Sequence, residues 1–195
     1  MFLISAFNQL PPADTMAVFK TTCYPWTNGS FKPLCYAKVA VKKGEGIYFD
    51  LTSFEREPYV ANSGDILDDS CVAACFNFFP DNSEKTVCFV SNSTGRVHWF
   101  EAENDTPVLK RVFEGETFAG EDERGWYWGV RFFVGFSELL SVYKKQELEP
   151  LHIVKGNIYK FVRAGEGAHL AAVAEVNEGF IFNSKNLDSF QIVDY

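Results

Sequence analysis

The chain carries little positive charge. Only 18 of its 195 residues are Lys or Arg, against 26 Asp or Glu, and the formal net charge is -8. The densest basic runs are two pairs, Lys42–Lys43 and Lys144–Lys145. Because an acidic surface without a basic patch repels phosphate backbones, no nucleic-acid partner is expected.

Long hydrophobic runs are absent as well. No stretch approaches the roughly 20 apolar residues that a membrane-spanning helix needs, so no membrane partner is expected. The apolar run 1–7 is too short for a signal peptide, and no positively charged residue precedes it. If Met1 is the native start, the sequence predicts a cytoplasmic protein.

Patterns for disulfides and metals are also missing. The five cysteines are odd in number and include no Cys-x-x-Cys pair, which argues against a disulfide framework and against a zinc site. The three histidines lie far apart, so no histidine metal site is expected. No cofactor is predicted. Calcium is kept as an alternative because acidic residues cluster in two runs, which are Asp65, Asp68 and Asp69, and Glu121, Asp122 and Glu123.

The chain has no catalytic motif. Gly135-Phe136-Ser137 does not match the Gly-x-Ser-x-Gly elbow of a nucleophilic serine. Glu114 and Glu116 lie in an acidic stretch that is interpreted as a surface loop, where they act as solubilising charges rather than as glycosidase carboxylates. The sequence therefore predicts a protein that is not an enzyme.

What dominates the chain is alternation of apolar and polar residues with period 2, which is typical of half-buried strands. Ranges 36–42 and 47–52 alternate in this way and are joined by a hairpin-like Gly44-Glu45-Gly46 link. Range 71–79 is apolar on both faces and reads as a central strand. Further strands are expected at 86–92, 96–101, 108–113, 157–163, 181–182 and 190–193.

The region around the tryptophans gives a loop, a strand and a helix. The acidic, Gly-bearing range 114–125 is predicted to be a loop. Range 126–134 is predicted to be a strand with Trp126 and Trp128 facing the core and with Tyr127 and Arg131 on the other face. Ser137 can cap a short helix over 138–144, which is the one helix expected.

Many short strands with turns between them indicate an all-β protein. The prediction is a single domain over 1–195, built as a sandwich of two antiparallel sheets of the immunoglobulin or jelly-roll kind, with 1–20 the least certain segment. The 47% hydrophobic content, including 20 Phe, suffices for one sizeable core. A closed barrel is the alternative, because periodicity does not choose between the two.

Several short fragments follow one another in a recognisable order and spacing. They are Pro25-Trp26, Phe54-Glu55, Asp69-Ser70-Cys71-Val72, the Asn92–Gly95 turn, the strand with Trp128, Phe136-Ser137 and Gly156-Asn157-Ile158-Tyr159-Lys160. Together they span about 20–195. In this respect the chain resembles the bacterial proteins similar to family 9 carbohydrate-binding modules.

The resemblance implies a non-catalytic β-sandwich that binds the ends of sugar chains between two Trp rings, with help from polar side chains and with structural calcium in some members. Asp69, Asn92 and His169 match the family pattern. The chain departs from it at four positions, where the family has Glu, Glu, Trp and Pro and this sequence has Ala73, Val90, Val173 and Gly135. The usual sugar-contacting positions have therefore diverged.

Three further ligand-binding candidates come from the strand patterns. Trp99 ends a hairpin strand and is expected to expose a stacking ring, and Tyr127 and Arg131 share the outer face of their strand. With Asp69, Asn92 and His169 they complete the predicted site. The predicted function is that of a non-catalytic carbohydrate-binding module-like protein with a saccharide partner. The alternative is a β-sandwich interaction or scaffold protein without a sugar site, and homo-oligomerisation is left open.

Overall fold

The computed structural model describes residues 1–27, 32–61, 63–144, 148–163, 165 and 167–195. These residues form one α-helix, α1 (Phe136–Tyr143), and three 3-10 turns, η1 (Ala13–Thr15), η2 (Ile66–Asp68) and η3 (Ser184–Asn186). The strands are β1 (Phe2–Phe7), β2 (Phe19–Lys20), β3 (Cys23–Thr27), β4 (Leu34–Lys42), β5 (Gly46–Phe54), β6 (Cys71–Asn77), β7 (Thr86–Asn92), β8 (Arg96–Glu103), β9 (Thr106–Glu114), β10 (Glu116–Asp122), β11 (Gly125–Gly135), β12 (Ile153–Val162), β13 (His169–Ala172) and β14 (Asp188–Asp194).

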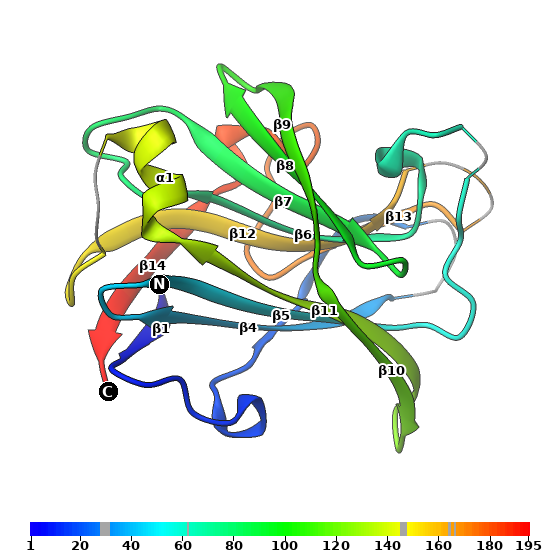
Figure 1. Cartoon of the computed structure of the whole chain (residues 1–195). Coiled ribbons are helices and arrows are strands. Elements are labelled where there is room, and N and C mark those ends of the chain that lie inside the picture. The colour runs from blue at the N-terminus through cyan, green and yellow to red at the C-terminus, as the bar shows by residue number, and fades with distance from the viewer. Residues whose placement is uncertain (28–31, 62, 145–147, 164, 166) are drawn as a thin grey trace.

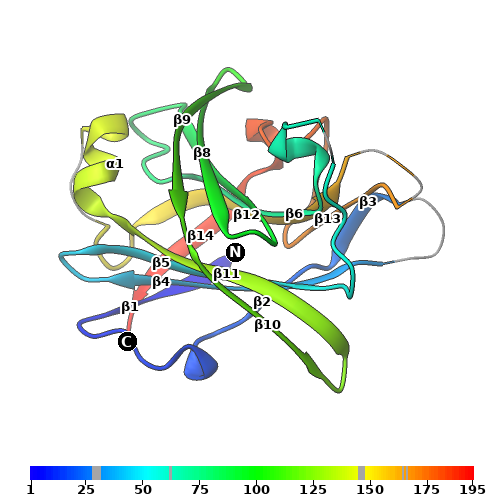
Figure 2. The ribbon, with the colours of Figure 1, turned by 45° about the vertical axis from the view of Figure 1, so that its right-hand side comes forward.

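All 14 strands belong to one sheet that folds back on itself. Its main path is β10-β11-β5-β4-β1-β14-β12-β6-β7-β8-β9, and β2, β3 and β13 pair beside this path. The layer of β4, β5 and β11 faces the layer of β12, β6 and β7 (Figure 1). The two end strands, β9 and β10, follow each other in sequence with only Gly115 between them, so one run of chain crosses from layer to layer (Figure 2). The sheet is therefore nearly closed into a barrel-like shape.

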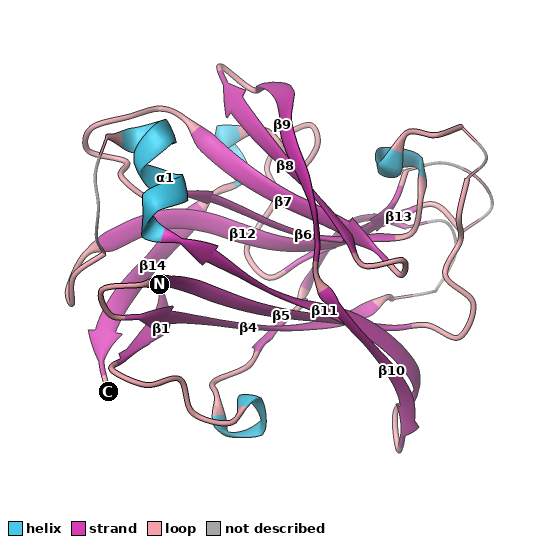
Figure 3. Cartoon of the chain, viewed as in Figure 1, coloured by secondary structure: helices cyan, strands magenta, loops and turns pink. Residues whose placement is uncertain are grey.

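The all-β prediction is confirmed, but the division into two antiparallel sheets is not. β1 pairs in parallel with both β14 and β4, and this joins the two layers into one mixed sheet. Periodicity could not reveal this pairing, because alternation tells which residues share a face and not which strand lies alongside. The predicted short helix is present as α1, and strand dominates the rest of the described residues (Figure 3).

Aromatic side chains fill the space between the layers. The ring of Phe49 on β5 lies 4.9 Å from that of Phe132, 5.4 Å from that of Phe89 and 6.1 Å from that of Phe76, between ring centroids. Phe76 and Phe89 come from the opposite layer, and all four side chains are buried. The phenylalanine content of the sequence thus forms the main core.

A second core covers the outer face of β6, β7 and β12. Every residue of β6 and β7 is buried, and for β6 this agrees with the two-sided apolar pattern of 71–79. Ala73 and Val90 pair across these strands and pack in a cluster with Tyr159, Ile181 and Phe182. The segment after β13 therefore folds over this face and closes it. In the sequence this segment was predicted to hold a strand at 181–182, which is wrong, since both residues lie in a turn.

Three further local predictions differ from the structure. The predicted loop at 114–125 contains the strand β10, whose acidic residues fit an edge strand because one side is open to solvent. α1 begins at Phe136, before the predicted cap Ser137, and the side chain of Glu138 accepts a hydrogen bond from Gly135 N at 3.1 Å. Trp126, predicted in the core, is 46% exposed because it lies beyond the edge of the core.

None of the helices formed by the described residues has both the length and the apolar character of a membrane span.

Close packing at Gly156 on β12 gives a first prediction. A Cβ atom there would overlap the ring of the buried Phe76, so Gly156→Ala should destabilise the protein by roughly 1–3 kcal/mol through overpacking. Gly167→Ala is the matched control, because its Cβ would meet no atom within 4 Å, and its effect should stay within about 0.5 kcal/mol. Urea denaturation of both variants measures the difference, and equal stabilities would contradict the packing account.

Candidate functional site

The six predicted ligand-binding residues do not converge on one surface. Asp69 and Asn92 meet at the ends of β6 and β7, and Tyr127 and Arg131 lie on the outer face of β11. His169 is buried within a polar cluster, and Trp99 is part of the main core. The structure thus separates the predicted set into two surface sites and two buried positions.

The buried polar cluster consists of Glu55, Ser70, Trp128, Lys160 and His169. One carboxylate oxygen of Glu55, Oε1, accepts hydrogen bonds from Ser70 Oγ at 2.5 Å and from Trp128 Nε1 at 2.8 Å. The Lys160 Nζ atom lies 3.1 Å from the same oxygen and donates to Ser70 Oγ at 2.6 Å. Lys160 also lies 3.3 Å from Nε2 of His169, whose Nδ1 is 2.7 Å from the carbonyl oxygen of Gly167.

This cluster joins elements from both layers at one end of the fold. Glu55 directly follows β5 and Trp128 lies on β11, whereas Ser70 precedes β6 and Lys160 lies on β12. The Lys160 side chain is 1% exposed and that of Glu55 is 15% exposed. Two of the fragments that carry the family resemblance, at 54–55 and 156–160, therefore supply a buried ion pair, and Ser70 of the fragment at 69–72 hydrogen-bonds to it.

The surroundings of Glu55 and His169 in this cluster lower the pKa values of both side chains. Burial raises the pKa of the Glu55 carboxyl, but the Lys160 ammonium and the donated hydrogen bonds outweigh burial, so the pKa lies below its usual value and the carboxylate stays charged. Burial and the adjacent Lys160 lower the pKa of His169 to about 4. His169 is therefore neutral at pH 7 and accepts a hydrogen bond from Lys160.

A pH dependence of stability follows from His169. Its pKa is about 4 in the folded chain against 6.5 for an ordinary histidine, so the unfolded chain binds the proton first and stability falls as the pH drops below 6.5. Between pH 7 and pH 5 the loss should be about 2 kcal/mol.

His169→Gln keeps an acceptor for Lys160 and removes the titration, so its free energy of unfolding should change less over this range. Urea denaturation at several pH values compares the two proteins. Parallel curves for the parent and the variant would rule out the contribution of His169.

The first surface site is a cavity of about 360 Å³ beside Asp69 and Asn92, here called the Asp69–Asn92 cavity. Asn92 Nδ2 donates to Asp69 Oδ2 at 2.7 Å, and the backbone N–H of Ala61 donates to Asp69 Oδ1 at 2.7 Å. Asn92 Oδ1 accepts from Thr94 N at 3.0 Å and from Thr94 Oγ1 at 2.6 Å. The two side chains are each 7% exposed and are held rigidly at the cavity wall.

Charged and neutral groups complete the wall of this cavity. Arg96 and His98 on β8 and Asp65 before η2 line it. The Arg96 side chain is 66% exposed, and its Nε atom lies 3.7 Å from Glu114. Burial, followed by the charge of Arg96, lowers the pKa of His98, so its ring is neutral at pH 7 and can both donate and accept a hydrogen bond. The cavity therefore offers donors and acceptors side by side.

Two of the three aspartates in the acidic run beside the cavity, Asp65 and Asp68, pair with an arginine. Arg163 Nη2 lies 2.6 Å from Asp68 Oδ1 and 3.5 Å from Asp65 Oδ2. Within the described residues, no group of three or more His, Cys, Asp or Glu side chains is placed to hold a metal ion.

The second surface site is a shallow groove of about 210 Å³ on the outer face of β4, β5, β11 and β10. It is called here the aromatic–arginine groove, and its lining includes Tyr36, Phe54, Phe118, Arg124, Tyr127 and Arg131. Tyr127 and Arg131 are the two predicted residues that the structure brings together here. Sequence reasoning missed the others, because they come from three separate strands and the turn after β10.

Trp99 does not expose a stacking ring, contrary to the prediction. It is 4% exposed and packs edge-on against Phe89, with ring centroids 5.2 Å apart. Trp99 and Val97 lie on the same face of β8, and both side chains belong to the main core between the layers. The alternation of this hairpin strand was visible in the sequence, but the side that faces the core was not.

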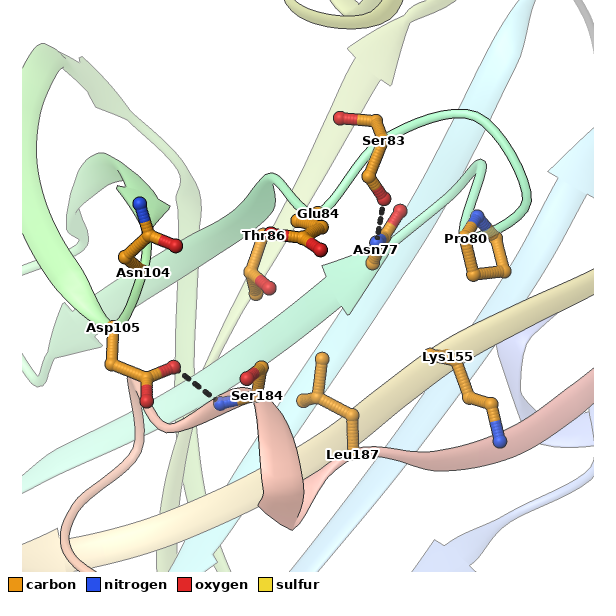
Figure 4. A pocket seen from close by; sticks show the side chains of 10 residues that line it. All are labelled: Asn77, Pro80, Ser83, Glu84, Thr86, Asn104, Asp105, Lys155, Ser184 and Leu187. Atoms are coloured by element: carbon orange, nitrogen blue, oxygen red, sulfur yellow. Dashed lines mark hydrogen bonds between the residues drawn. The ribbon is translucent and has the colours of Figure 1, made fainter.

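A larger pocket of about 450 Å³ lies at the opposite end of β6 and β7 (Figure 4). Two of its polar side chains are tied to the fold, because Asn77 Nδ2 donates to Ser83 O at 2.6 Å and Asp105 Oδ1 accepts from Ser184 N at 2.8 Å. No predicted ligand-binding residue lines it. It is a hollow between turns rather than an extension of either surface site.

Comparison with known proteins finds similar folds among solved structures. No protein-family model matches the chain, and no curated protein matches it. A solved structure from Bacteroides uniformis, described as a candidate carbohydrate-binding protein, matches with a TM-score of 0.72 at 14% identity, over 98% of this chain and 99% of that one.

Two family 9 carbohydrate-binding module structures from Caldicellulosiruptor kristjanssonii are also similar. The glucose complex has a TM-score of 0.58 and the cellotriose complex 0.59, each at 9% identity and over 100% of this chain, with 96% and 94% of those chains covered. The resemblance to family 9 modules is thus confirmed for the fold.

Proposed function

We propose that this protein is a non-catalytic carbohydrate-binding protein and that a neutral saccharide binds in the Asp69–Asn92 cavity. The observation that carries the proposal is the Asp69–Asn92 pair, which keeps two residues of the family pattern together at a cavity wall. The similarity of the fold to carbohydrate-binding proteins over nearly the whole chain supports the ligand class.

The chemistry of the cavity suits hydroxyl groups. Sugar hydroxyls both donate and accept, and here Asp65 and Asp69 accept, Arg96 and Asn92 donate, and the neutral ring of His98 does either. The forked guanidinium of Arg96 can reach two neighbouring hydroxyls at once. Since no Trp ring lines the cavity, polar contacts must supply the affinity, which favours a dissociation constant in the millimolar to micromolar range, or about -4 to -8 kcal/mol.

The site has diverged from the family pattern for a structural reason. Ala73 and Val90, which replace family carboxylates, have no exposed surface because the second core covers them. A carboxylate at either position would be buried among apolar side chains at a large energetic cost. The ligand is therefore held beside this face and not on it.

Two of the described groups at the cavity are engaged within the fold. Thr94 Oγ1 donates to Asn92, and Asp65 is paired with Arg163. This arrangement supports binding without turnover.

The second candidate function is an interaction or scaffold protein without a sugar site. The covering of the Ala73–Val90 face by the protein's own chain favours it, because that face is closed to any ligand. The two candidates differ in whether any saccharide binds.

Binding to glucose, cellotriose and a glycan panel tests the proposal. The protein should bind at least one saccharide in calorimetry, and Arg96→Met should weaken binding about tenfold or more, since a hydrogen bond to a charged group contributes roughly 1.5–3 kcal/mol. Arg111→Met is the matched control, because Arg111 is an exposed arginine on β9 outside the cavity, and it should bind as the parent does. Absence of binding to every saccharide by a folded protein would leave the scaffold function instead.

A further inference from the structure

The aromatic–arginine groove is built differently from an ordinary solvated strand face. Such faces usually carry scattered charged side chains, whereas here four half-buried aromatic rings lie together. The ring of Phe54 is 5.2 Å from that of Tyr36 and 5.7 Å from that of Tyr127, and Tyr127 is 6.4 Å from Phe118. The rings form one continuous aromatic surface across β4, β5, β11 and β10.

Two glycines allow the outer rings to lie against the sheet. A Cβ atom at Gly129 on β11 would overlap the ring of Phe118, and a Cβ atom at Gly120 on β10 would overlap the hydroxyl end of Tyr127. Each ring therefore lies over a position that has no side chain. Arginine side chains lie over the rings of Phe118 and Phe54, so Tyr127 is the ring that offers an open face.

The two arginines are held in fixed orientations beside these rings. Arg131 Nε donates to Asp50 Oδ2 at 3.0 Å, and its guanidinium carbon lies 4.1 Å from the centre of the Phe118 ring. Arg124 donates to Asp122 Oδ2 from Nε at 3.1 Å and from Nη2 at 2.7 Å, and its guanidinium carbon lies 5.1 Å from the Tyr36 ring centre. Each guanidinium is thus held by a carboxylate at one edge and by an aromatic face.

A buried carboxylate anchors the groove. Asp50 is 2% exposed and is opposite Arg131 in the register of β5 and β11. It also accepts a hydrogen bond from Thr52 Oγ1 at 3.3 Å. The arginine fork has five N–H donors. Asp50 takes the Nε donor of Arg131 and Glu116 lies 3.6 Å from Nη1, so Nη2 keeps donors for a ligand.

Flat aromatic faces beside pre-oriented arginine forks are the chemistry that recognises a sugar ring. The C–H groups on the face of a pyranose pack against an aromatic face, and neighbouring hydroxyls accept from the two nitrogens of a guanidinium. The volume of about 210 Å³ is smaller than the roughly 300–1,000 Å³ of a pocket for a drug-sized molecule, so it suits one sugar unit.

We propose that the aromatic–arginine groove is a second saccharide-binding site, which takes a single pyranose unit on the ring of Tyr127 with its hydroxyls bonded to Arg124 and Arg131. The ligand class rests on the proposed function, but the site itself does not. The groove lies on the outer face of the β5–β11 layer, whereas the Asp69–Asn92 cavity lies at β6, β7 and β8 in the other layer. Two sites on one chain give avidity toward a polysaccharide that either site alone would bind weakly.

Backbone amide signals in nuclear magnetic resonance can distinguish the two sites. The amides of Gly120 and Gly129 lie under the groove rings, and the side-chain amide of Asn92 reports on the cavity. Titration with glucose and with cellotriose should shift the glycine signals in the groove. The variants Tyr127→Ala and Arg124→Met should weaken that response by about tenfold or more, the loss expected for one hydrogen bond to a charged group or a lost stacking ring.

The matched variants separate the outcomes. Arg96→Met should weaken the cavity response only, and Arg111→Met should change neither. Tyr127→Phe keeps the ring and guards against misfolding of Tyr127→Ala, so it should retain binding in the groove. Shifts at Asn92 without shifts at Gly120 and Gly129 would overturn the groove and leave the proposed function standing. Shifts confined to the groove would support the groove as a saccharide site and overturn the cavity as one. Absence of any shift would overturn both proposed sites.

Discussion

The buried ion pair between Glu55 and Lys160 is the contact on which the arrangement of the two layers depends. Burying either charge without its partner would be costly, so the ends of β5 and β12 must meet wherever this fold forms. Ser70 and Trp128 satisfy the same carboxylate oxygen and bring in the start of β6 and β11. The ion pair thus fixes the register between layers that share few neighbouring strands.

This constraint changes the meaning of the family fragments. Asp69-Ser70, Phe54-Glu55 and the stretch ending at Lys160 carry the resemblance, and their polar residues mostly face inward. The second core also removes positions from the surface, because Ile181 and Phe182 pack with Ala73 and Val90 on the outer face of β6 and β7. What the chain shares with carbohydrate-binding modules is therefore mainly architecture. The two proposed ligand-binding sites lie at the margin of the covered face and on the opposite layer.

Sequence reasoning located strands better than it located sites. The predicted strand 86–92 has the same bounds in β7, because both its faces are apolar and its turns are marked. The sequence did not predict the parallel strand β1. It predicted a loop at β10, because an edge strand with one side open to solvent carries many polar residues. The prediction that Trp99 exposes its ring was wrong because alternation does not tell which face of a strand is covered. Lys160 gave one signal that went unused, a lysine between Tyr159 and Phe161 in an otherwise apolar strand.

A double-mutant cycle on the ion pair tests this account most directly. The proteins are the parent, Glu55→Gln, Lys160→Met and the double variant, compared by urea denaturation at pH 7. Each single change leaves one buried charge without its partner and should cost about 3–5 kcal/mol, while the double variant should lose clearly less than the sum. Single losses that simply add, or singles as stable as the parent, would show that the layers do not depend on this pair.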